Sequence, residues 1–262
     1  MEGAFLLRKK CKDAQVNQIE VTRDGAVLSV QLNRPDKKNA INKGMYGDLN
    51  AALTQATEDF GIRAVVLSGA GDSFTAGNDI FDFANHVPTD SSAPGFQFIQ
   101  NLHNFPKPLI AAVHGRAVGI GTTALLHCDA VYAAPDTQFS MPFVTLGLVP
   151  EAGSSFLFPR LVGLARASEI LLTGRTFNAS EGREIGLVNS IEEDPLAAAM
   201  KTAQRIAEQP PTAVMNTKAL IKSSNHGPVE AVMEAEGELF RIALQSEEAQ
   251  AAFMKFMSGK GK

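Results

Sequence analysis

Cysteine, net charge and long apolar runs are all scarce in this 262-residue chain. The two cysteines, Cys11 and Cys128, lie far apart with no CxxC spacing and no cluster of metal-ligand residues, which indicates reduced thiols and no metal site. The formal net charge of -4 excludes a general electrostatic attraction to nucleic acid or to an anionic membrane surface. No apolar run is long enough to span a bilayer.

The two ends of the sequence carry no targeting pattern. Residues 1–12 contain four Lys or Arg but lack the apolar core of a signal peptide, and Ser258 to Lys262 do not form a peroxisomal Ser-Lys-Leu ending. We therefore expect a cytoplasmic protein that contacts neither nucleic acid nor membrane. With 45% hydrophobic and 20% charged residues, the chain can bury one large core.

Strand-like and helix-like segments alternate in the first half of the chain. The sequence predicts a hairpin that turns at Asp24-Gly25, a helix over Lys43 to Phe60, and buried strands over 63–68, 108–113 and 130–134. Further helices are predicted between these strands. This alternation indicates parallel strand pairing with right-handed crossovers.

After about residue 150 the pattern is helical. The expected helices cover 154–161, 165–172, 179–185, 195–208, 212–223 and 228–257, with a break at Pro210-Pro211. We therefore expect an α/β fold in two parts. Residues 1–200 would form the core with the ligand site, and residues 201–262 would form a helical extension that packs on the core or on a neighbouring subunit.

Glycines follow two of the buried strands and mark the candidate site. They lie in Ser68 to Ile80 and in Pro108 to Gly121. Glycine lets the backbone turn sharply, and a helix that begins at such a turn points unpaired N–H groups at a ligand. Two such donors directed at one oxygen would stabilise an oxyanion. From the pattern alone, simple turns are the commoner explanation, and Gly119-Ile-Gly121 lacks the third glycine of a dinucleotide fingerprint.

Several motifs, in order, resemble the crotonase (enoyl-CoA hydratase/isomerase) superfamily over nearly the whole chain. They are Leu32-Asn-Arg-Pro35 with Asn39-Ala40, Phe74-Thr-Ala-Gly-Asn-Asp-Ile80, Lys107-Pro-Leu-Ile-Ala-Ala-Val-His-Gly115, Gly119-Ile-Gly121, Cys128-Asp129, Leu146-Gly-Leu-Val-Pro150 and Gly186-Leu-Val188. The resemblance implies a spiral of ββα turns with a helical C-terminal trimerisation region, assembled as a homotrimer or a hexamer. It also implies an acyl-CoA thioester substrate, with coenzyme A as part of the substrate and no separate cofactor.

By motif position, the resemblance implies an oxyanion hole made by the backbone N–H groups of Ala76 and Ile120. Members of the family usually have glycine at the second position, so the side chain of Ile120 must point away from the thioester. The implied substrate-binding residues are Ala76, Gly77, Asn78, Asp79 and Ile80, with Arg34 and Lys37 as candidate contacts for the phosphates of coenzyme A. Exposed Lys and Arg are, however, usually only solvated.

The two glutamates of enoyl-CoA hydratases are absent from the matching positions. Thr123 and Phe143 stand there instead, and neither side chain can act as an acid or base near neutral pH. A different carboxylate, Glu151, stands where peroxisomal-type Δ3,Δ2-enoyl-CoA isomerases carry a glutamate. One carboxylate over one face of the acyl chain can remove a proton from C2 and return it at C4, through a dienolate whose charge the oxyanion hole stabilises.

The leading hypothesis is therefore a Δ3,Δ2-enoyl-CoA isomerase of β-oxidation with Glu151 as its catalytic base. Without the resemblance, Glu151 is better explained as a residue of a first helical turn, where the helix dipole favours a carboxylate. Apolar neighbours would raise its pKa; those expected are Phe143, Leu146, Leu148 and Phe156. The alternatives are hydration, dienoyl-CoA isomerisation or thioester hydrolysis at the same oxyanion hole, and acyl-CoA binding without chemistry.

Overall fold

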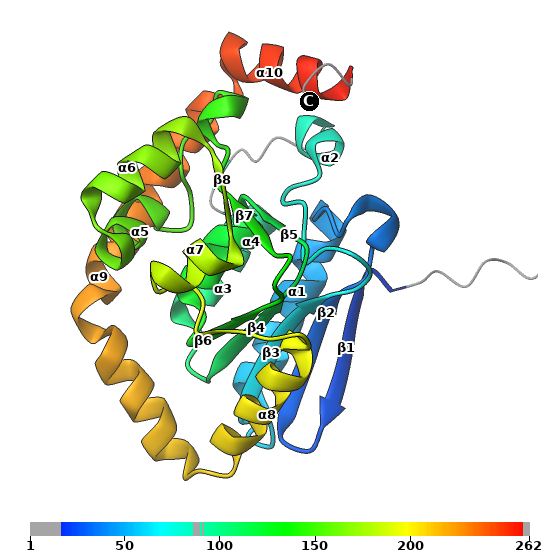
Figure 1. Cartoon of the computed structure of the whole chain (residues 1–262), viewed down its shortest axis with the longest axis vertical. Coiled ribbons are helices and arrows are strands. Elements are labelled where there is room, and N and C mark those ends of the chain that lie inside the picture. The colour runs from blue at the N-terminus through cyan, green and yellow to red at the C-terminus, as the bar shows by residue number, and fades with distance from the viewer. Residues whose placement is uncertain (1–16, 86–89, 91, 259–262) are drawn as a thin grey trace, which may run out of the picture.

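The computed structural model describes residues 17–85, 90 and 92–258 (Figure 1). Cys11 and the sequence features predicted for residues 1–12 and 259–262 lie outside the described residues. Among the described residues, no helix combines the length and the apolar character that crossing a bilayer requires.

A six-stranded sheet forms the centre of the molecule. Its strands run in the order β1-β2-β3-β4-β6-β9. Their bounds are Ile19–Asp24, Val27–Leu32, Ala64–Gly69, Leu109–Val113, Ala130–Ala133 and Ser190–Ile191. β1 pairs antiparallel with β2 through the turn at residues 25–26, and all the other pairs are parallel. The predicted hairpin, buried strands and α/β class are therefore confirmed.

Helices cover both faces of this sheet (Figure 1). Side chains of a strand alternate between its faces, so Val65 and Leu67 of β3 join the larger core cluster, which also contains the buried residues of α1 (Lys43–Glu58) and α3 (Pro94–Asn104). Ala64 and Val66 face the other way and pack in a second cluster with Ala199 and Ala203 of α8 (Pro195–Ala207). The inner strands β3 and β4 are thus buried on both sides, as their apolar runs predicted.

A second, three-stranded sheet was not predicted. β5 (Arg116–Val118) pairs parallel with β7 (Gln138–Ser140), which pairs antiparallel with β8 (Thr176–Asn178). Each strand has three residues, too few to show an alternating pattern. β5 begins three residues after β4 ends, so this sheet continues the chain that leaves the main sheet and positions the glycines that follow it.

Short helices and turns connect the two sheets, and longer helices follow them. The remaining helices are η1 (Pro35–Lys37), α2 (Ile80–Asn85), α4 (Ile120–Thr123), η2 (Ala124–His127), η3 (Val144–Leu146), α5 (Ser154–Val162), α6 (Leu164–Thr173), α7 (Ala179–Glu184), α9 (Pro211–Leu244) and α10 (Glu247–Met257). In Figure 1, α9 runs along the left side of the molecule and α10 crosses its top, near α2. The division of the chain at residue 200 stays a prediction, and that residue lies within α8.

The predicted helix break before Pro228 is wrong. α9 continues through Pro228 to Leu244, and the break comes at Ser246, whose side chain accepts a hydrogen bond from the N–H of Ala249 at the start of α10. A proline removes one backbone hydrogen bond from a helix, and here Pro228 and Ser224 are both exposed, so water can hydrate the carbonyl left without a partner. Ser246, a favourable N-cap residue, marks this boundary in the sequence, but the apolar periodicity continues past it.

Candidate active site

The two glycine-rich segments that follow β3 and β4 lie against each other. Thr75 donates from its N–H to the carbonyl of Arg116 at 2.9 Å, and Val118 donates to the carbonyl of Thr75 at 3.1 Å. Gly77 has a φ of +85°, and a Cβ there would lie 2.7 Å from the carbonyl oxygen of Val118. Glycine is required at this position both for its conformation and for the close approach.

The N–H of Ala76 is not available to a ligand. It donates to the carbonyl of Lys38 at 2.8 Å. The assignment of Ala76 to an oxyanion hole is therefore wrong, because a backbone donor that already has a partner within the protein cannot serve a ligand without breaking that bond.

The N–H of Asn78, two residues further, is unoccupied instead. Ile41 donates to the carbonyl of Gly77 at 2.8 Å and accepts from the N–H of Asp79 at 2.9 Å, so the intervening amide of Asn78 points away from Ile41. No acceptor lies within hydrogen-bond distance of that N–H in the part of the chain that the structure describes. Asn78 is thus the residue of this segment that can offer a backbone donor to a ligand.

The second segment offers the N–H of Ile120. Ile120 is the first residue of α4, and the helix is preceded by Gly119, whose φ is +55° and which makes no side-chain cap. Thr122 and Thr123 donate to the carbonyl of Gly119, which leaves the N–H of Ile120 without an intrahelical acceptor. The Ile120 side chain is buried in the main core cluster, so it does not cover its own amide.

Two adjoining cavities meet at these segments. The larger, of about 1160 Å³, is lined by Asn78 and Ile120, and the smaller, of about 460 Å³, is lined by Asn78 and Glu151. Asn78, Phe83 and Phe240 line both. The predicted residues Arg34, Lys37, Ala76, Gly77, Asp79 and Ile80 all line the larger cavity.

Glu151 is a buried carboxylate beside α4. Its side chain is 5% exposed, and the hydroxyl of Thr123 donates a hydrogen bond to its Oε1. Burial raises the pKa of Glu151 to about 8, although the Thr123 hydrogen bond lowers it and the charge of Glu236 raises it further. The sequence alone suggested that Glu151 lies in the first turn of a helix. It does not, because α5 begins only at Ser154.

Tyr46, which the sequence analysis did not single out, connects these groups. Its hydroxyl donates to Oδ1 of Asn78 at 2.5 Å. Burial raises the pKa of Tyr46, and the charge of Glu151 raises it further, so the hydroxyl stays protonated and remains a donor. The signal in the sequence was weak, since Tyr46 occupies an ordinary buried position on α1.

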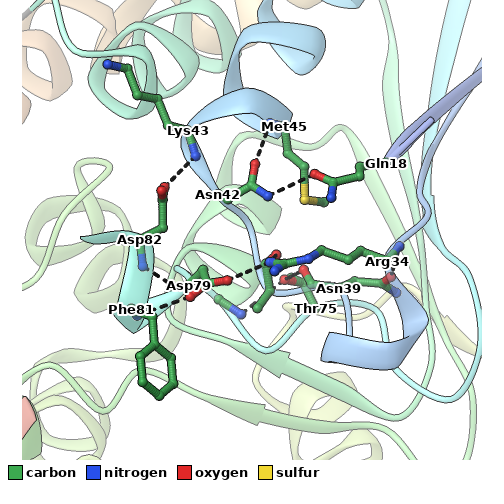
Figure 2. A network of polar contacts seen from close by, with 12 residues as sticks. Gln18, Arg34, Asn39, Asn42, Lys43, Met45, Thr75, Asp79, Phe81 and Asp82 are labelled. Atoms are coloured by element: carbon green, nitrogen blue, oxygen red, sulfur yellow. Dashed lines mark hydrogen bonds and ion pairs between the residues drawn. The ribbon is translucent and has the colours of Figure 1, made fainter. Parts of the chain in front are cut away.

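Arg34 and Asp79 form a partly buried ion pair at the wall of the larger cavity. Figure 2 shows the two side chains pointing toward each other, and their closest atoms, Nη1 and Oδ2, lie 2.6 Å apart. The other oxygen of Asp79 accepts from the N–H groups of Phe81 and Asp82 and so caps the start of α2. Burial alone would raise the pKa of Asp79, but the hydrogen bond from Arg34 and the two backbone donors lower it below its ordinary value.

Two lysines add positive charge to the larger cavity. Lys37 lies on η1, and Lys255 lies on α10, far away in the sequence. Lys255 was not predicted, because nothing in the sequence brings the last helix to this wall. Two lysines and Arg34 around one opening suit a ligand that carries phosphate groups.

The other candidate groups have structural partners. Nε2 of His114 lies 3.0 Å from the carbonyl of Gly71, and Nε2 of His127 lies 2.7 Å from the carbonyl of Ala152. Burial raises the pKa of Cys128 to about 12, so its thiol stays protonated. Within the described residues, no cluster of three or more His, Cys, Asp or Glu side chains could hold a metal ion.

Comparisons with known proteins show what the chain as a whole is similar to. A family model described as enoyl-CoA hydratase/isomerase matches residues 22–261. Enoyl-CoA delta isomerase 2 of Rattus norvegicus is 38% identical over 252 residues, which cover 93% of this chain and 64% of that protein, so this chain spans 64% of its relative's length. The 2,3-dehydroadipyl-CoA hydratase of Escherichia coli is 31% identical over 247 residues, which cover 92% of this chain and 96% of the hydratase.

A solved structure is similar to this chain over most of its length. It is described as an enoyl-CoA hydratase/isomerase from Pseudoalteromonas atlantica, and it matches with a TM-score of 0.89 at 39% identity, over 92% of this chain and 97% of that one. These likenesses confirm the family and the fold that the sequence motifs indicated.

Proposed function

The chain belongs to the enoyl-CoA hydratase/isomerase family, and we propose that within it the protein is a Δ3,Δ2-enoyl-CoA isomerase with Glu151 as its single acid–base group. The observation that carries this proposal is the buried carboxylate of Glu151, which lines the same cavity as Asn78, while Asn78 and Ile120 line the adjoining larger cavity. The relatives include both isomerases and hydratases, so the choice between the two reactions rests on the site.

Glu151 has the properties that moving one proton along an acyl chain requires. Its raised pKa of about 8 makes the ionised form a stronger base than an exposed carboxylate, while the protonated form can still return the proton near neutral pH. The base would remove a proton from C2 of a 3-enoyl thioester and deliver it to C4. The double bond then moves from C3 to C2, and Glu151 ends the cycle ionised, as it began.

The N–H groups of Asn78 and Ile120 would stabilise the dienolate between these two steps. Negative charge develops on the thioester oxygen, and two fixed donors in a site shielded from water stabilise such charge best. Losing one donor of this kind typically costs about 2.7–4 kcal/mol of transition-state stabilisation. Asn78 replaces Ala76 in this role because only its N–H is free.

The side chains at the hydratase positions support isomerisation over hydration. The hydroxyl of Thr123 donates a hydrogen bond to Glu151, and Phe143 is a buried phenyl group. Neither could activate a water molecule, because a hydroxyl titrates far too high and a phenyl not at all. Hydration would need a second acid–base group, whereas isomerisation needs only Glu151.

The lining of the larger cavity supports a coenzyme A thioester as the substrate. Arg34, Lys37 and Lys255 at its wall would bind the phosphates of coenzyme A, and the smaller cavity, which contains Glu151, would take the acyl chain. We also propose that the protein works in fatty-acid β-oxidation, in the cytoplasm, as a homotrimer or hexamer. Light scattering of the purified protein would decide between those assemblies.

The decisive experiment is Glu151→Gln assayed with 3-enoyl-CoA esters of graded length. A general base contributes about 10²–10⁴-fold to rate, so we expect kcat to fall by at least about 100-fold with KM little changed. Glu238→Gln, an exposed change on α9, should keep wild-type activity. Wild-type isomerisation by Glu151→Gln would overturn the proposal. A 3-hydroxy product formed from trans-2-enoyl-CoA at a rival rate would favour hydration, and binding without turnover of any ester would favour a non-catalytic protein.

A further inference from the structure

A second buried carboxylate lies beside the turn that carries Glu151. Glu236 of α9 is 6% exposed, although most of that helix faces solvent. Its Oε2 accepts from the N–H of Gly153 at 2.6 Å, and its Oε1 accepts from the N–H of Ser155 at 2.9 Å. In the described parts of the chain no cation pairs with it. Within the described residues, its partners are therefore these two backbone donors and the side chain of Ser155.

These two donors belong to the start of α5, directly after the Glu151 turn. The first N–H groups of a helix have no intrahelical acceptor, and the helix dipole favours a negative charge there. A carboxylate buried without a cation is costly unless such donors satisfy it. The contact joins residues 83 positions apart, so it attaches α9 to the candidate site.

The turn is closely packed between two elements. Ala152 and Gly153 are both left-handed, with φ values of +60° and +69°, and a left-handed non-glycine residue needs its surroundings to hold it. A Cβ on Gly153 would lie 2.9 Å from Cγ1 of Val229 on α9. On the opposite side, the buried ring of His127 bonds the carbonyl of Ala152.

One face of α9 makes all these contacts. Its buried residues Val229, Met233, Glu236 and Phe240 are spaced by four, three and four positions, the spacing of a single helix face. Phe240, one turn beyond Glu236, lines both cavities. The helix therefore reaches the site at two levels, the cavity wall and the turn behind it.

We propose that Glu236 is a positioning residue for Glu151: its carboxylate accepts hydrogen bonds from Gly153 and Ser155 and so fixes the turn that presents the base. The inference rests on the proposed function, since it assumes that Glu151 is the base. Glu236 does not touch the substrate in this proposal, because it lines neither cavity. It acts only through the Glu151 turn.

Three groups with ionisable or hydrogen-bonding side chains face Glu151 from different elements. Tyr46 approaches from α1, Thr123 from α4 and Glu236 from α9. The Thr123 hydroxyl stabilises the ionised form of Glu151, whereas the charge of Glu236 opposes it and raises the pKa of the base. Removing the charge of Glu236 should therefore make Glu151 a weaker base that ionises at lower pH.

The test compares wild type, Glu236→Gln, Glu236→Ala and Glu238→Gln in the isomerase assay, with Glu151→Gln as the inactive reference. Glutamine keeps one acceptor and the volume of the side chain but no charge. For Glu236→Gln we expect the acid limb of kcat/KM to move to lower pH, and the plateau kcat to fall more than KM changes. Glu236→Ala loses both hydrogen bonds and should lose roughly 10- to 100-fold in kcat. Glu238→Gln, exposed on the same helix, should match wild type in every measurement.

The outcomes separate the two proposals. If Glu151→Gln is inactive while Glu236→Gln keeps the wild-type pH profile and kcat, the positioning role is overturned and the proposed function stands. A Glu236→Gln enzyme that only melts at lower temperature, with kcat and pH profile unchanged, assigns Glu236 to capping α5 and overturns the inference equally. If Glu151→Gln retains isomerisation, both proposals fail together. Circular dichroism on each variant confirms that it is folded before assay.

Discussion

Every residue of β3 and β4 is buried, and so are Glu151, Thr123 and Glu236, yet the two regions are held together differently. In the sheet, apolar side chains alternate between two core clusters, and burying them is itself favourable. Around the Glu151 turn, polar groups are buried at a cost and depend on hydrogen bonds to offset it. The difference indicates that the sheet maintains the fold, whereas the turn region contributes less to stability because it buries polar groups at the candidate site.

The largest expected effect on stability is in the sheet. Leu109→Ala on β4 removes a fully buried side chain and should lower the free energy of unfolding by about 2–5 kcal/mol. The kcat of the folded enzyme should stay near wild type, because Leu109 lines neither cavity. Urea unfolding and the isomerase assay measure the two effects. Leu164→Ala, on a side chain that is 74% exposed, is the control with little expected loss.

The comparison would break if Leu109→Ala changed kcat as much as it changed stability. That result would mean that the sheet and the site are not separable, and that packing at β4 sets the geometry of the base.

In the turn region, replacing the buried side chain of Glu151 should instead raise the free energy of unfolding at high pH. Burial raises the pKa of Glu151 from 4.5 to about 8, so the folded state holds this proton more tightly than the unfolded chain does. The stability that comes from the bound proton is complete below about pH 4.5 and is lost as the pH rises through about 8. Glu151→Gln never becomes charged and should therefore exceed wild type at pH 9 by up to about 5 kcal/mol, since each unit of pKa shift is worth about 1.4 kcal/mol.

Urea unfolding at pH 5 and pH 9 measures this difference. The gain of Glu151→Gln over wild type should be much smaller at pH 5, where both side chains are neutral. If Glu151→Gln were less stable than wild type by the same amount at both pH values, the buried charge of Glu151 would not be what destabilises the wild type. Glu238→Gln should show no such pH-dependent gain.

The smallest expected effect sharpens the comparison within the site. Tyr46→Phe removes one hydrogen bond, to Oδ1 of Asn78, and should cost about 0.5–1.5 kcal/mol of stability. Because Asn78 also carries a free N–H, we expect kcat to fall by less than about tenfold, with hardly any change in KM. Steady-state kinetics with a 3-enoyl-CoA ester measures both constants. An unchanged kcat would show that the segment around Asn78 holds its position without Tyr46.

Much of the fold could be predicted because its signals are local. The hairpin, the buried strands and α1 follow from turn residues and apolar periodicity. The strands of the second sheet could not be predicted, because three residues carry no period and their pairing joins β5, β7 and β8 across the chain. The helix through Pro228 was misjudged for a related reason, since only its exposure makes the proline tolerable.

The site was predicted in part. The roles of Glu151 and Ile120 stay predictions, and the structure places both at cavity walls. Motif position assigned the first donor to Ala76, whose N–H donates to the carbonyl of Lys38. Glu236 was missed, although a glutamate in line with Val229, Met233 and Phe240 interrupts an apolar face and is a signal that could be sought.

The sequence by itself determined where strands, helices and glycine turns form, because those depend on neighbouring residues. It also determined that a glutamate stands at position 151 and that Thr123 and Phe143 carry no acid–base group. Only the tertiary structure decided which amides are free and which carboxylates are buried. Whether an N–H is occupied or a charge is desolvated depends on partners such as Lys38 for Ala76 and Gly153 for Glu236, and no local pattern encodes contacts across such distances.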